Sequence, residues 1–65
     1  MLKVNQPEKA LYKVGQRVTC DYEPGVTYKV AKKHWDMFGT VFYEIHEVNG
    51  VRYMSGLRQK FLNNA

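Results

Sequence analysis

Residues 43–53 read YEIHEVNGVRY, and this stretch decides the fold. Asn49-Gly50 is a strong signal for a two-residue hairpin, because both central positions of a type I′ turn need a positive φ. Residues that face each other across such a hairpin lie on the same side of the sheet. The pairs that this turn predicts are Val48 with Val51, Glu47 with Arg52, His46 with Tyr53 and Ile45 with Met54.

The strand that leads into this hairpin, at residues 40–48, has two unlike faces. One face is apolar, and the other carries Phe42, Glu44 and His46, which Tyr53 joins from the next strand. We expect the apolar face to be buried and the second face to lie outside, unless a bulge exchanges their roles. The expected core is Val18, Tyr28, Val30, Val41, Tyr43 and Ile45.

Two further strands are expected before the hairpin. Residues 17–22 alternate polar and apolar side chains with period two, and residues 26–31 are rich in β-branched and aromatic side chains. The turn between them is expected at residues 23–25, where Gly25 takes the positive φ of a type II turn. Residues 32–39 break the alternation and predict a loop.

After the hairpin, Ser55-Gly56 is expected to end the fourth strand. Residues 57–60 fit a single 3₁₀ turn, and residues 61–62 fit a short final strand. The expected organisation is a lead-in or edge strand at 1–10, one domain at 11–62 and a polar tail at 63–65.

This pattern resembles the SH3-like barrels, including small ones often encoded by phages and prophages. The resemblance rests on KVGQRV at residues 13–18 and on the hairpin at 43–53, and it covers roughly residues 11–62. It implies an all-β fold, a single small barrel of about five short antiparallel strands with a 3₁₀ turn before the last strand. The chain lacks the ALYDY run and paired acids of signalling SH3 domains and the Gly-rich core of a KOW element, so neither family's binding residues carry over.

Length and cysteine content limit the class of protein. A chain of 65 residues has room for one domain, and its single cysteine excludes an intramolecular disulfide. Two histidines far from that cysteine give no zinc-ligand spacing. No apolar run approaches the 18 or more residues of a membrane span, and MLKVNQPEKA lacks the apolar stretch of a signal peptide. We expect a cytoplasmic protein without a cofactor, a metal or a membrane partner.

Catalysis is not expected, because few residues suit it. Cys20 is in phase with Val18 and Tyr22, so we expect it on the buried strand face as an inert thiol. His46 is expected to lie across from Tyr53 on the exposed face, where it is an ordinary strand residue. The five glycines fall singly at turns and form no phosphate-binding loop.

The binding surface is expected where cations and aromatic residues come together. The formal net charge is +4, and segments 27–35 and 51–65 carry cations without acids. Trp35 either caps an open end of the barrel or anchors a partner, and both interpretations stay open. The expected binding residues are Lys32, Lys33, Trp35, Phe38, Phe42, Arg52 and Tyr53.

Two classes of partner remain. Mixed charges around an aromatic cluster suit a protein, and the resemblance to small phage-type barrels implies docking on a larger protein machine and modulating it. Net positive charge and stacking side chains suit nucleic acid, although Asp36, Glu44 and Glu47 oppose it. We expect a protein partner, with nucleic acid as the alternative, and a monomer or a weak homo-oligomer.

Overall fold

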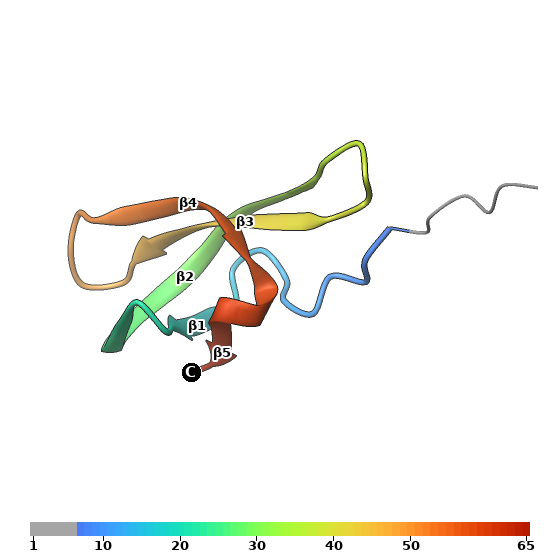
Figure 1. Cartoon of the computed structure of the whole chain (residues 1–65). Helices are drawn as coiled ribbons and strands as arrows, with labels where there is room; N and C mark the ends of the chain where they lie inside the picture. Colours follow the sequence, from blue (N-terminus) through green and yellow to red (C-terminus); the bar gives the residue numbers. More distant parts are fainter. Residues whose placement is uncertain (1–6) are drawn as a thin grey trace, which may run out of the picture.

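The computed structural model describes residues 7–65, so most of the expected lead-in at 1–10 lies outside the described residues. Five antiparallel strands form one sheet in the order β4-β3-β2-β1-β5 (Figure 1). The all-β prediction is therefore confirmed. The sheet does not close on itself, because β4 and β5 are its two edges. The elements are β1 (Arg17–Cys20), β2 (Glu23–Trp35), β3 (Val41–Glu47), β4 (Tyr53–Arg58), a 3₁₀ turn η1 (Gln59–Phe61) and β5 (Leu62–Asn64).

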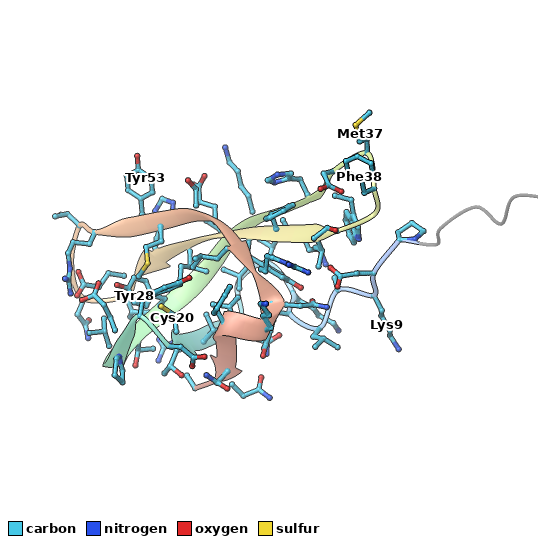
Figure 2. All side chains as sticks on the ribbon, viewed as in Figure 1. Lys9, Cys20, Tyr28, Met37, Phe38 and Tyr53 are labelled. Atoms are coloured by element: carbon cyan, nitrogen blue, oxygen red, sulfur yellow. The ribbon has the colours of Figure 1, made fainter. Side chains whose placement is uncertain are left out.

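The core lies on one face of the sheet. All six expected core side chains are buried, with at most 1% of their surface exposed. Cys20 lies among them beside Tyr28, as expected (Figure 2). The set also includes Tyr12, Leu57 and Leu62, which the sequence had not singled out. No helix in the described part of the chain is long and apolar enough to cross a membrane.

The register of the β3–β4 hairpin is confirmed, but the predicted turn type and the predicted Val48–Val51 pair are wrong, because the innermost hairpin hydrogen bond joins Glu47 to Arg52. His46 pairs with Tyr53 and Ile45 with Met54, as expected. Gly50 and its neighbour have no positive φ, which excludes a type I′ turn. The Glu47 carboxylate lies under the loop to reach Arg52, so a Cβ at Gly50 would clash with it. Glycine at this position favours the Glu47–Arg52 contact by allowing close approach, since any larger residue would displace the flexible Glu47 carboxylate.

The first turn falls earlier than predicted. Cys20 pairs with Glu23, so the chain reverses at residues 21–22 and β2 begins at once. Gly25 does have a positive φ of 91°, but within the irregular start of β2. Because β1 ends before it, Tyr22 leaves the buried face and is 58% exposed, which contradicts its predicted burial. Its ring lies 5.2 Å from that of Phe61.

The predicted loop at residues 32–39 is also wrong, since β2 continues to Trp35 and the loop begins only at residue 36. A register shift between Val30 and Lys32 leaves Ala31 as the extra residue of a β-bulge. The bulge reverses the alternation of inward and outward side chains along β2, so the sequence pattern after residue 31 does not look like a continuation of the strand. Beyond it, Lys32 points to the outer side and Lys33 to the inner side.

A second bulge extends β4. Met54 pairs with Ile45 and Leu57 with Tyr43, so β4 holds one residue more than β3 over this stretch. Gly56 lies inside the bulge with a φ of 68°. The single 3₁₀ turn is confirmed, two residues later than predicted. Residues 63 and 64, expected in a polar tail, belong to β5 and pair with β1.

Candidate functional site

The side of the sheet opposite the core, here called the outer face, carries three cross-strand rows of polar and aromatic side chains. The rows follow from the pairing of the strands, because directly opposed residues share a face. The first row is Arg17, Lys29, His46 and Tyr53, the second is Lys32 and Glu44, and the third is His34, Phe42 and Arg58. The row centres on β3 are two residues apart, about 7 Å.

Two aromatic pairs stand at the ends of this surface. His46 stacks on Tyr53 with ring centroids 5.4 Å apart and planes inclined by 29°. His34 stacks on Phe42 at 5.7 Å and 24°. Tyr53 is 62% exposed and points away from the interior, as Figure 2 shows. Each end of the outer face therefore offers an aromatic platform to solvent.

Glu44 is the acidic side chain of the three rows. His46 Nε2 donates a hydrogen bond to Glu44 Oε2 at 2.7 Å. This hydrogen bond lowers the pKa of the Glu44 carboxyl, and the nearby charge of Lys32 lowers it further. Glu44 is thus held as a carboxylate between the two aromatic platforms.

The other acidic side chains form hydrogen bonds with protein groups off the outer face, most of them at the surface. The six carboxylates of the chain all accept hydrogen bonds from protein groups. Apart from Glu44, the pairs are Glu8 with the Val41 amide, Asp21 with Asn63, Glu23 with Tyr28 and Arg52, Asp36 with the Phe38 and Thr40 amides, and Glu47 with Arg52. Glu44 is therefore the one carboxylate of the described residues that lies within the three rows.

The cations show the opposite behaviour. Among the lysines and arginines of residues 7–65, only Arg52 is ion-paired, at 2.7 Å to Glu23 and 3.3 Å to Glu47. The hydrogen bond between Arg52 and Glu47 lowers the pKa of that carboxyl. Arg17, Lys29, Lys32 and Arg58 are all exposed on the outer face. This face consequently presents unpaired positive charge.

The structure brings together three of the seven expected binding residues and separates the rest. Lys32, Phe42 and Tyr53 lie on the outer face. Lys33 and Trp35 share the opposite side with Tyr43 and Val41. Phe38 lies in the loop after β2, and Arg52 lies in the loop before β4. The expected residues therefore do not form one continuous surface.

Trp35 has a structural role in the described structure. Its indole Nε1 donates to the backbone oxygen of Glu8 at 2.8 Å. The amide of Glu8 in turn donates to the oxygen of Gly39 at 2.7 Å. Trp35 is 41% exposed, so more than half of its surface is covered. These contacts favour the interpretation of Trp35 as a cap, because it fastens the segment before residue 10 to the β2–β3 hairpin.

The tip of the β2–β3 hairpin is a second exposed surface. Met37 and Phe38 are 88% and 70% exposed there, at the end of the hairpin (Figure 2). The Asp36 carboxylate accepts hydrogen bonds from the Phe38 and Thr40 amides, both at 2.9 Å. The turn is therefore ordered, and it holds two large apolar side chains in solvent.

An open hollow lies beside η1. It measures about 290 Å³ and is lined by Glu8, Leu11, Arg58, Gln59 and Lys60. Gln59 Oε1 accepts from the Leu11 amide and from Tyr43 Oη, so its polar wall is already engaged. Within residues 7–65 no three side chains of His, Cys, Asp or Glu gather as a metal site.

Sequence reasoning missed several outer-face residues, although part of the signal was present. Lys29 alternates with the buried Tyr28 and Val30, which was enough to place it outside. His34 and Arg58 lie beyond the two bulges, so period-two counting assigns them to the wrong side. No local pattern marks either bulge as a site of binding.

Comparison of the chain with protein-family models, with curated proteins and with solved structures found no match. The function is therefore inferred from the geometry of the outer face and of the hairpin tip.

Proposed function

We propose that the chain is a small SH3-like binding module without catalytic activity, and that its outer face binds nucleic acid. The strand order, with a 3₁₀ turn before the last strand, supports the SH3-like assignment. The observation that carries the function is the separation of charge described above. All Asp and Glu side chains except Glu44 lie off the outer face, while four exposed cations and two aromatic platforms occupy it.

This arrangement answers the main objection to nucleic acid. Asp36 and Glu47 lie between the two basic segments of the sequence, but in the fold both carboxylates bind protein groups away from the outer face. Glu44 alone remains within the rows, and Lys32 lies opposite it. Phosphate binding depends on the number of lysines and arginines that neutralise phosphates, and the outer face offers enough for about four contacts.

The test is a titration of a fluorescein-labelled oligonucleotide pool, single-stranded and duplex, followed by anisotropy between 50 and 200 mM salt. About four phosphate contacts predict a log–log salt slope of about −3 for single strands. Lys29→Gln with Lys32→Gln should reduce that slope by about 1.4 and weaken binding to all sequences.

The matched control removes the same charge elsewhere. Lys9→Gln with Lys60→Gln changes the net charge equally. Lys9 lies before β1 (Figure 2), and Lys60 lies in η1. The control pair should bind within about threefold of the parent protein, since it loses no face contact. Equal losses in both variants, or no binding of either probe, would refute the proposal.

A protein partner is the second candidate function, and the exposed Met37 and Phe38 favour it. Apolar side chains held on an ordered turn suit insertion into a pocket of a larger protein machine. A pull-down from native cell extract, with and without nuclease, separates the two functions. Partners that survive nuclease but disappear with Met37→Ser and Phe38→Ser support protein docking. Loss of all partners after nuclease supports nucleic acid.

A further inference from the structure

We infer that the ligand of the outer face is a single strand whose unstacked bases stack on the two aromatic platforms. This inference rests on the proposed function and names its substrate class. Its basis is the spacing of the platforms, His46 with Tyr53 and His34 with Phe42, at opposite ends of one face.

The platforms are too far apart for neighbouring bases of a helix. Phe42 and His46 are four residues apart on the same strand, which corresponds to about 13 Å. Successive phosphates of a duplex strand advance by only about 3.4 Å along the axis. Duplex bases also hide their faces in the stack. A ligand that covers both platforms must therefore present separated bases, which a single strand does.

Cations flank both platforms, and one lies between them. Lys29 is the cross-strand neighbour of His46, and Arg58 is that of Phe42. Lys32 lies in the middle row on the β2 side of β3. A strand running along β3 from one platform to the other thus passes a cation in each of the three rows, and passes the Glu44 carboxylate in the middle row. Stacking along a basic track binds many sequences, because every base has an aromatic face.

A substitution of Glu44 tests the track by a gain of affinity, which damage to the fold would not produce. Its carboxylate lies midway along the track and repels phosphate. Glu44→Gln removes this charge and leaves a side chain of the same size on the surface. The variant should bind a single strand more tightly than the parent, by about twofold to tenfold at low salt. A destabilised protein would bind less tightly.

The experiment uses the full chain and two probes, fluorescein-labelled (dT)15 and a labelled duplex of the same length. The platform variant is Phe42→Leu with Tyr53→Leu, which changes no charge. It should weaken (dT)15 binding at least thirtyfold and leave the salt slope unchanged. Tyr53→Leu alone, at a side chain 62% exposed, should cost at least fivefold without disturbing the fold.

The matched control for Tyr53→Leu is Tyr22→Leu, which removes an aromatic ring of similar exposure, 58% against 62%, that does not belong to the three rows. It should bind (dT)15 within threefold of the parent protein. Thermal melting of each variant verifies the fold.

The outcomes separate this inference from the proposed function. Equal affinity for duplex and (dT)15, or full binding by the platform variant, would overturn the single-strand inference and leave nucleic-acid binding standing. Absence of binding to both probes would remove the proposed function itself. A stronger effect of Tyr22→Leu than of Tyr53→Leu would place the stacking surface elsewhere.

Discussion

Replacement of Trp35 by alanine tests whether this residue caps the fold. The side chain is 41% exposed, and the covered part corresponds to roughly 100–150 Å², or about 2.5–4 kcal/mol of apolar burial. The indole donates to the Glu8 oxygen, which contributes about 0.5–1.5 kcal/mol more. The segment it fastens gains freedom on release, which offsets part of the sum. We expect Trp35→Ala to lower the free energy of unfolding by about 2–4 kcal/mol.

Trp35→Phe separates the two contributions, because it keeps an aromatic ring and removes the N–H donor. It should cost about 1 kcal/mol. Urea unfolding must be followed by circular dichroism, since Trp35 is the only tryptophan of the chain. Amide exchange adds a local readout: the Glu8 amide, bonded to Gly39 at 2.7 Å, should lose protection while core amides keep theirs.

Met37→Ala is the control, because a side chain 88% exposed should change stability by less than about 0.5 kcal/mol. Trp35→Ala with an equally small effect, and with an unchanged Glu8 amide, would refute the cap and restore the interpretation of Trp35 as an interface anchor.

Three further predictions concern the core, the thiol and acid stability. Ile45→Ala should cost about 2–5 kcal/mol in urea unfolding, most of the stability of a domain this small; retention of the parent midpoint would contradict its burial. Cys20 should react slowly with a thiol reagent in native protein and at once in urea, so fast native labelling would exclude a buried thiol. The hydrogen bond from Arg52 lowers the pKa of Glu47 in the folded protein, so its stabilising effect is present above the ordinary carboxyl pKa and is lost as pH falls through the lowered one. Glu47→Gln should therefore lose less stability between about pH 7 and about pH 3, and an unchanged pH profile would contradict the pair.

The core was predictable from the sequence because it depends on alternation within uninterrupted strands. Residues 41–45 keep period two, and the side chains expected inside are buried there. The pairing of His46 with Tyr53 followed from the position of the turn, even though the loop is longer than predicted. The observed loop at residues 48–51 and the predicted loop at residues 49–50 share the same centre, so both give the same register.

The candidate site was less predictable because it depends on two bulges. Each bulge adds one residue to one strand, and no local rule requires it at Ala31 or near Gly56. A bulge forms where the tertiary packing that it allows outweighs its local cost. A sequence pattern contains no information about that packing. Leu57 illustrates this: the bulge in β4 turns its side chain inward to complete the core. Arg58 is thereby turned outward.

The bulges link the packing of the core to the composition of the outer face. At Ala31 the shift turns Trp35 toward the inner side, where it meets Glu8, and the same shift turns His34 outward onto Phe42. In β4 the shift that buries Leu57 brings Arg58 beside Phe42. The same two bulges thus turn apolar side chains inward and polar side chains onto the outer face. The platform of His34 and Phe42, with Arg58 beside it, exists only because both bulges occur. The outer surface is therefore a product of the fold and not of any contiguous sequence motif.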